Sequence, residues 1–169
     1  MTIAIATGGR RLRVTHEYWP LLDAVREKHR ITKIWHGGAA GADEGVALWA
    51  NARGLDVEAF PAPWDLFKQG RLNEKAAGMR RNTDMFDGKR GYVLAEVTQL
   101  EEIEQAPLAL SERAGEAKPR HRTLITTEQV EGTPELLLAL PGYKGTRGAI
   151  RLAEARQIVV ERIMVEPMV

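Results

Sequence analysis

The stretch His36-Gly37-Gly38-Ala39-Ala40-Gly41-Ala42-Asp43 decides the fold, because an apolar run precedes it and a helical pattern follows it. Residues 31–35 are typical of a buried strand, and residues 43–53 of a helix that ends before Gly54. Small residues between a strand and a helix let the backbone approach an anion, toward which the free N–H groups of the helix N-terminus point. The stretch therefore predicts a phosphate-binding turn.

Two other turns resemble this one. Gly8-Gly9-Arg10 follows a strand predicted at residues 3–7, and residues 141–146 follow a strand predicted at residues 136–140. The turns that follow parallel strands lie at one edge of the sheet, where ligands bind at the point of reversed strand order. A single Gly-Gly turn is more often only a tight connection, but three at one edge favour an anion site. Arg10, Lys144 and the helix N-termini would supply its positive potential.

The remaining core elements alternate between strand and helix. They are helices at residues 16–29, 70–85 and 146–156 and strands at residues 55–60 and 158–165. Thr15 is the expected N-cap of the first helix, Pro20 falls in its first turn, and Pro61-Ala62-Pro63-Trp64 interrupts regular structure. Short connections between such units predict an α/β three-layer sandwich with a mostly parallel, five-stranded sheet.

The pattern loosens over residues 87–133, which we interpret as an irregular or helical insertion before the fourth core strand. Four apolar residues have the spacing of one helix ending before Pro107: Val93, Val97, Leu100 and Ile103. Tyr92-Val93-Leu94 is equally compatible with the start of a strand. Residues 111–122 are typical of a mobile loop, and Arg120-His121-Arg122 within it would contact a partner, cap a ligand or remain solvated.

Composition excludes several classes of protein. The 169 residues carry a net charge of +1 and no cysteine, which excludes disulfides and thiolate chemistry and disfavours a protein that coats nucleic acid. No apolar run approaches bilayer length, and we expect no signal peptide. No residues have metal-ligand spacing, so we expect no metal and no cofactor. The expectation is a single-domain, soluble, cytoplasmic protein without a membrane partner.

Four motifs resemble a known family when they are taken together. Thr7-Gly8-Gly9-Arg10, residues 36–43, Pro61-Ala62-Pro63-Trp64 and residues 77–85 are similar to the YspA-like, cpYpsA-related branch of the SLOG superfamily. That superfamily joins the DNA-processing protein A fold with the Lonely Guy phosphoribohydrolases. The resemblance covers residues 2–85 and resumes from Leu136 to the last helix. It implies one Rossmann-like domain over residues 1–169, a nucleotide-derived ligand, and a homodimer or higher homo-oligomer.

The Lonely Guy enzymes cleave the N-glycosidic bond of a nucleoside monophosphate with an Arg and a Glu, and only the Arg has a counterpart here. Arg81-Asn82-Thr83-Asp84-Met85 matches the Arg motif of those enzymes. Their Pro-Gly-Gly-x-Gly-Thr turn corresponds to residues 141–146, where Tyr143 replaces a Gly and no Glu follows within a few residues. Glu154 is too far along the helix to replace that Glu. Asp43 and Asp84 are the nearby carboxylates.

The expected site gathers residues from all these motifs. The ligand-binding candidates are Gly8, Gly9, Arg10, Gly37, Gly38, Ala39, Gly41, Asp43, Trp64, Arg81, Asn82, Pro141, Gly142, Lys144, Gly145 and Thr146, and the catalytic candidates are Arg81 and Asp43. Asp43 is equally plausible as a helix-capping carboxylate, and Trp64 more often fills a core at a sheet edge than stacks on a base. Asn82 is interpreted as a brace of the adjoining turn, and His36 as structural.

The leading functional hypothesis is that the protein binds a nucleotide or nucleotide-derived ligand as a sensor or sequestering module. An alternative is a nucleoside-monophosphate N-glycosidase, a hydrolase in which Arg81 anchors the phosphate and Asp43 replaces the missing Glu. A third hypothesis is single-stranded nucleic-acid binding, by analogy with the DNA-processing branch. The near-neutral net charge makes it the weakest of the three.

Overall fold

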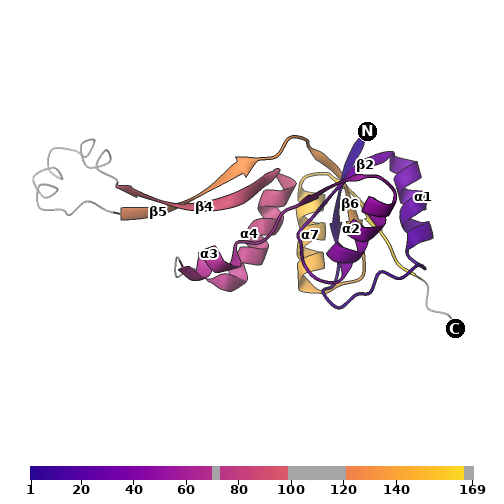
Figure 1. Cartoon of the computed structure of the whole chain (residues 1–169), viewed down its shortest axis with the longest axis horizontal. Coiled ribbons are helices and arrows are strands. Elements are labelled where there is room, and N and C mark those ends of the chain that lie inside the picture. The colour runs from indigo at the N-terminus through magenta and orange to yellow at the C-terminus, as the bar shows by residue number, and fades with distance from the viewer. Residues whose placement is uncertain (70–72, 99–120, 166–169) are drawn as a thin grey trace, which may run out of the picture.

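A parallel sheet of five strands forms the centre of the molecule. The computed structural model describes residues 1–69, 73–98 and 121–165 (Figure 1). The sheet strands are β1 (Thr2–Thr7), β2 (Ile31–His36), β3 (Asp56–Ala59), β6 (Pro134–Ala139) and β7 (Val159–Arg162). Their order is β3-β2-β1-β6-β7, and every neighbouring pair is parallel. The strand order therefore reverses between β1 and β6, as it does in Rossmann-like folds.

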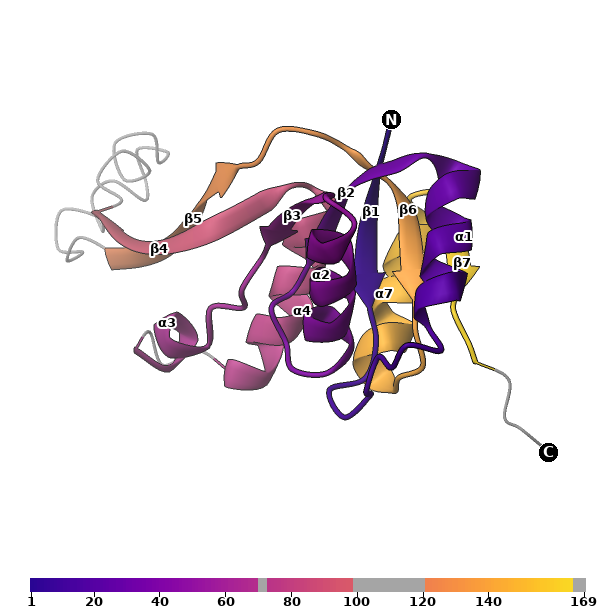
Figure 2. The same cartoon turned by 45° about the vertical axis from the view of Figure 1, so that its right-hand side comes forward.

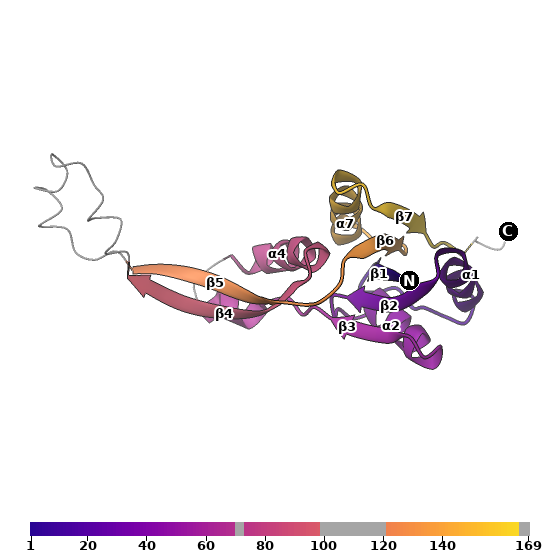
Figure 3. The ribbon, with the colours of Figure 1, turned by 90° about the horizontal axis from the view of Figure 1, so that it is seen from above.

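Helices cover both faces of this sheet, which confirms the predicted three-layer α/β architecture. Helices α1 (Trp19–His29) and α2 (Ala42–Ala52) lie on one face, and α4 (Glu74–Phe86) and α7 (Lys144–Ala155) lie on the other (Figures 2 and 3). Alternate residues of each strand face opposite layers, so Ala4 packs with the α1–α2 cluster while Ile5 packs with the α4–α7 cluster. None of the helices that the structure describes is both long and apolar enough to cross a bilayer.

Several helix boundaries differ from the prediction, and one short helix was not predicted. Helix α1 begins at Trp19 rather than His16, and its N-cap is Tyr18 rather than Thr15. The N–H of Tyr18 donates to the carbonyl oxygen of Thr15 at 3.0 Å, so the chain completes a turn before the helix begins. Trp64 does not lie in an irregular stretch; it is the first residue of a short helix, α3 (Trp64–Gln69), which the prediction lacked.

The region interpreted as an insertion contains an antiparallel hairpin that extends from the α/β body (Figures 1 and 3). Strand β4 (Lys89–Thr98) pairs with β5 (His121–Gln129). The strand alternative at residues 92–94 is therefore confirmed, and a helix through Val93 and Val97 is wrong. The interpretation of residues 89–98 and 121–129 as irregular is also wrong, because they form paired strands. Leu100, Ile103 and residues 111–120 lie outside the described residues.

Polar contacts hold the base of this hairpin against the body. Arg90 Nη1 donates to Glu58 Oε2 at 2.5 Å and to the carbonyl oxygen of Ala59 at 3.1 Å, which ties β4 to β3. The hydroxyl of Tyr92 donates to Asp84 Oδ2 of α4 at 2.8 Å. The hairpin is thus oriented by the same β3 and α4 elements that lie beside the candidate site.

Candidate functional site

The three glycine-containing turns meet at Gly9. The N–H of Gly9 donates to the carbonyl oxygen of Pro141 at 2.8 Å, and its carbonyl oxygen accepts from the N–H of Ala42 at 3.1 Å. The turn after β1 is therefore bonded both to the turn after β6 and to the start of α2. Gly8 must lack a side chain, because a Cβ there would overlap the Cβ of Ala42 and lie 3.0 Å from that of Leu140.

A cavity of about 960 Å³ opens where these turns meet. Most of the residues expected to bind the ligand line it: Gly8, Gly9, Arg10, Gly37, Ala39, Asp43, Trp64, Arg81, Asn82, Pro141, Gly142, Gly145 and Thr146. The cavity lies at the carboxyl ends of β1 and β6, between which the strand order reverses. This is the position at which open α/β sheets bind their ligands.

Three expected residues do not line this cavity. Gly38 and Gly41 have φ values of 72° and 83°, so they shape the turn after β2 by adopting a conformation that other residues rarely accept. Lys144 begins α7 with an exposed side chain. The positive charge at the cavity comes instead from Arg10, Arg81 and one residue that was not predicted, Arg11.

The first turn of α7 places a buried hydroxyl at the cavity. Thr146 is 6% exposed, and its Oγ1 has no hydrogen-bond partner within the part of the chain that the structure describes. A buried polar atom without a partner costs free energy in the unliganded protein. The free N–H groups of a helix N-terminus lie in the same turn, and the two together suit an anionic oxygen.

Arg81 lines the cavity and also holds its wall. Nη1 donates to the carbonyl oxygens of Gly37 and Phe60, and Nε donates to Asn82 Oδ1 at 2.8 Å. Burial, which penalises the charged form, lowers the pKa of Arg81, while the nearby Asp43 opposes that shift. A Cβ at Gly37 would overlap the guanidinium, so this close approach requires a glycine there. Asn82 pairs with Arg81 at the cavity and does not brace the turn directly.

Asp43 holds the backbone of the turn after β2 through hydrogen bonds and does not cap α2. Its Oδ2 accepts from the N–H of Gly37 at 3.0 Å and from that of Ala39 at 3.3 Å. The N-cap of α2 is Gly41, with no side-chain capping bond, so the expected capping role is wrong. Burial raises the pKa of Asp43, although these hydrogen bonds and Arg81 oppose the rise.

His36 has a similar bracing contact, in agreement with the structural role expected for it. Its Nδ1 accepts from the N–H of Gly38 at 2.9 Å, which places the ring proton of the neutral form on Nε2. Burial lowers the pKa of His36; Asp43 raises it and Arg81 lowers it further, each by a smaller amount. His36 does not line the cavity.

Trp64 lies at the cavity mouth instead of filling a core. Its side chain is 40% exposed, and the guanidinium carbon of Arg10 lies 5.6 Å from its ring centroid. Gly78 of α4 lies against the indole, because a Cβ there would come within 3.1 Å of Trp64 Cη2. Two further apolar side chains at the mouth are largely exposed: Met79 at 74% and Tyr143 at 82%.

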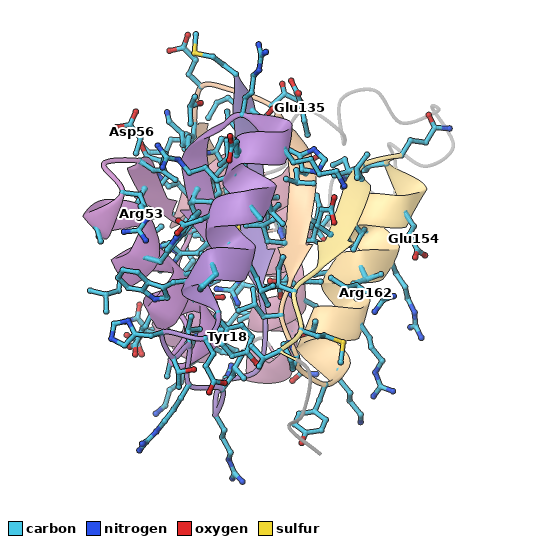
Figure 4. The ribbon with its side chains drawn as sticks, turned by 90° about the vertical axis from the view of Figure 1, so that its right-hand side faces the viewer. Tyr18, Arg53, Asp56, Glu135, Glu154 and Arg162 are labelled. Carbon is cyan, nitrogen blue, oxygen red and sulfur yellow. The ribbon has the colours of Figure 1, made fainter. Side chains whose placement is uncertain are left out.

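Asp43 is the only carboxylate among the described residues that line the cavity. Asp84 is buried elsewhere, where its Oδ2 accepts from Arg80 at 2.9 Å and from Tyr92 at 2.8 Å. Glu154 is exposed and points away from the core on the outer side of α7 (Figure 4). Within residues 1–69, 73–98 and 121–165, no three His, Cys, Asp or Glu side chains gather as metal ligands would.

Several lining residues were absent from the expected set. They are Ala6, Thr7, Arg11, Leu12, Gly78, Met79, Met85 and Tyr143. Most of them lie within or beside the quoted motifs, so their sequence position was a usable signal. No sequence signal identified Leu12, because its approach to the cavity depends on the path of the loop after β1.

Comparison with known proteins gives a match to a family model. The model of the YspA, cpYpsA-related SLOG family matches residues 2–67, which extend from β1 into α3 and include the first two glycine-containing turns and Trp64. None of the curated proteins and none of the solved structures matches the chain.

Proposed function

Because the model of the YspA, cpYpsA-related SLOG family matches residues 2–67, we propose that the chain binds a nucleotide or nucleotide-derived ligand in the cavity between β1 and β6. The family match supports a nucleotide-related ligand in general. The proposal adds the place of binding and the role, which is that of a sensor or sequestering module.

The observation that carries this proposal is that the hydroxyl of Thr146, at the N-terminus of α7, has no hydrogen-bond partner among the described residues. A phosphate oxygen placed there would accept from Thr146 Oγ1 and from the free N–H groups of the first helical turn. Arg10 and Arg11 line the same cavity and would add charge-assisted hydrogen bonds. Together they supply an anion subsite at the junction of the turns after β1 and β6.

The rest of the cavity suits the base and sugar of a nucleotide. Its volume of about 960 Å³ is large enough for such a ligand. Trp64, Met79 and Leu12 supply an apolar section, while the arginines supply a cationic one. A ligand with one anionic end and one planar apolar end uses both sections, whereas inorganic phosphate uses only one.

The test is calorimetric titration with AMP, GMP, ADP-ribose and cyclic AMP, using the wild-type protein and Thr146→Val. The valine keeps the shape of Thr146 and removes the unpartnered hydroxyl. We expect the variant to bind the nucleotide about tenfold more weakly, because a hydrogen bond to a charged group is lost. We expect its unliganded form to be at least as stable as the wild type, because the cost of an unpaired buried group disappears.

A matched control is Thr83→Val on α4, whose exposed hydroxyl donates to the carbonyl oxygen of Met79 at 3.1 Å. Thr83 does not line the cavity, so its substitution should leave nucleotide binding unchanged. If no member of the panel binds the wild-type protein, the proposed function is wrong. If the nucleotides bind and Thr146→Val binds them equally well, the anion subsite lies elsewhere.

One observation supports hydrolysis of the ligand as a second candidate. Asp43 lines the cavity close to Arg81, and burial raises the pKa of its carboxyl group. Its Oδ2 is bonded to two backbone N–H groups, so Oδ1 would have to perform the acid–base chemistry. Release of free base from AMP, followed by chromatography, tests this candidate. Asp43→Asn preserves the acceptor for both N–H groups, so an unchanged rate in that variant would remove Asp43 from the mechanism.

A further inference from the structure

Among the described residues, the guanidinium of Arg10 makes one favourable side-chain interaction, and the nearby Arg81 carries a like charge that repels it. The Arg10 guanidinium lies over the indole of Trp64, 5.6 Å from the ring centroid, and no hydrogen bond or ion pair to another described residue engages it. Its backbone, in contrast, is packed tightly, because a Cβ at Gly41 would overlap the carbonyl group of Arg10. The side chain can therefore change rotamer while the turn that carries it stays in place.

The position of Arg10 conflicts with stacking of a base on the indole face that Arg10 covers. A planar base in contact with the indole occupies the first ~3.5–4.0 Å above the ring, and a guanidinium stacked beyond it needs about the same again. The observed separation of 5.6 Å is too short for both layers. Gly78 lies against the same indole, which limits how far Trp64 can retreat into α4.

We propose that Arg10 and Trp64 form an exchange pair that couples recognition of the phosphate to recognition of the base. In the unliganded protein Arg10 covers the indole face. When a nucleotide enters, the guanidinium leaves the indole for the phosphate, and the base takes the vacated face of Trp64. Arg10 is thus a specificity-determining residue: it opposes ligands that have a base without a phosphate and favours ligands that have both.

This inference rests on the proposed function, and it predicts effects of opposite sign for two related probes. The affinity of Arg10→Ala for AMP should be at least about tenfold lower than that of the wild type, because a charge-assisted contact is lost. Adenosine should bind the same variant about two- to fivefold more tightly, because the competing cation–π contact is gone. Trp64→Ala should weaken the binding of both probes about tenfold, because it removes the stacking surface. Calorimetric titration measures all of these affinities.

The matched control is Arg13→Ala, which removes the same charge from an exposed position in the same loop outside the cavity lining. It should change the affinity for either probe by less than about twofold, because exposed charges act weakly at a distance.

A second measurement needs no ligand. Trp64 fluorescence, taken as the difference between each protein and the same protein carrying Trp64→Phe, reports on the exposed indole, because the subtraction removes the signals of the buried Trp35 and Trp49 and of the partly buried Trp19. Acrylamide should quench this signal more strongly in Arg10→Ala than in the wild type or in Arg13→Ala. Equal quenching in all three proteins would mean that Arg10 does not cover the indole in solution.

The outcomes separate this inference from the proposed function. If no nucleotide of the panel binds, both are wrong. If AMP binds the wild type while Arg10→Ala lowers the affinity for adenosine or leaves that affinity unchanged, the proposed function stands and the exchange pair is wrong. If adenosine binds neither protein measurably although AMP binds, Trp64 offers no base subsite and the exchange pair is again wrong.

Discussion

At the scale of single residues, three buried polar side chains hold the backbone of the turn after β2. Asp43 accepts from the N–H groups of Gly37 and Ala39, His36 accepts from that of Gly38, and Arg81 donates to the carbonyl oxygen of Gly37. These side chains and backbone groups are therefore hydrogen-bonded to one another and need no ligand as a partner. The turn is held in shape before any ligand arrives, which lowers the entropy lost on binding.

The pKa of His36 predicts how stability depends on pH. Burial lowers this pKa below its usual 6.5, so the unfolded state binds the proton more readily than the folded state. The stability that neutral His36 contributes is therefore present above about pH 6.5 and is lost as pH falls through the lower, folded-state pKa. In His36→Asn, whose amide oxygen can replace Nδ1 as the acceptor, the free energy of unfolding should fall less steeply from about pH 7 to 5. Urea denaturation measures the slope.

The control for this prediction is His16→Asn, at a position where the ring is exposed. That variant should retain the steep slope of the wild-type protein. A His36→Asn slope that matches the wild type would mean that other groups determine the pH dependence in this range.

At the scale of elements, the site depends on how closely α2 approaches the loop that follows β1. Gly45, one turn into α2, faces Val14, and a Cβ there would overlap the Cβ of Val14. Because Gly45 has no side chain, the loop can pack closely against the helix. The carbonyl oxygen of Gly9 can then accept from the N–H of Ala42. The glycine is therefore needed for packing between elements, even though it weakens the helix that contains it.

Two glycine-to-alanine substitutions in helices should consequently have opposite signs. Gly45→Ala should lower the free energy of unfolding by about 1–3 kcal/mol, because the added methyl group overpacks the contact with Val14. Gly148→Ala in α7 should raise it by about 0.5–1 kcal/mol, because nothing lies within 4 Å of the new Cβ and alanine favours the helix. Chemical denaturation at one pH compares the two variants. Equal effects would show that packing against the loop is unimportant.

At the scale of the whole molecule, the β4–β5 hairpin extends beyond the five-stranded body (Figure 3). Val93 is 56% exposed and Leu124 36% exposed. The strand register places both residues on one face of the hairpin, because Val93 pairs with Thr126 and Ala95 pairs with Leu124. A two-stranded hairpin is only marginally stable in water, so a covered apolar face would stabilise it.

We accordingly expect the protein to be a homodimer in which this face is covered. Size-exclusion chromatography with light scattering should give twice the 18.8 kDa mass of the chain. The double variant Val93→Lys, Leu124→Lys should shift this mass toward that of one chain, because the face becomes charged. Exposed Leu48 on α2 provides a control, and Leu48→Lys should leave the mass unchanged. A monomeric wild-type protein would contradict the prediction.

Much of the fold and of the candidate site could be predicted from the sequence, because both depend on short-range patterns. The apolar run at residues 31–35 predicts β2, and the glycines after it predict a turn and the start of α2. The strand–helix alternation then predicts the parallel sheet, and a parallel sheet places the turns at one edge. Even so, residue type alone could not separate Arg11, which lines the cavity, from Lys144, which does not.

The sequence by itself thus determined the strand–turn–helix units, the order of the motifs and the edge at which they meet, because these follow from residues close together along the chain. Tertiary structure decided the contacts between distant segments. Only the fold places Arg10 over Trp64, closes Arg81 onto Gly37, and leaves Thr146 Oγ1 without a partner among the described residues. Tertiary structure also determines that Val93 lies in a strand and not in a helix, because pairing with β5 supplies hydrogen bonds that local periodicity does not reveal.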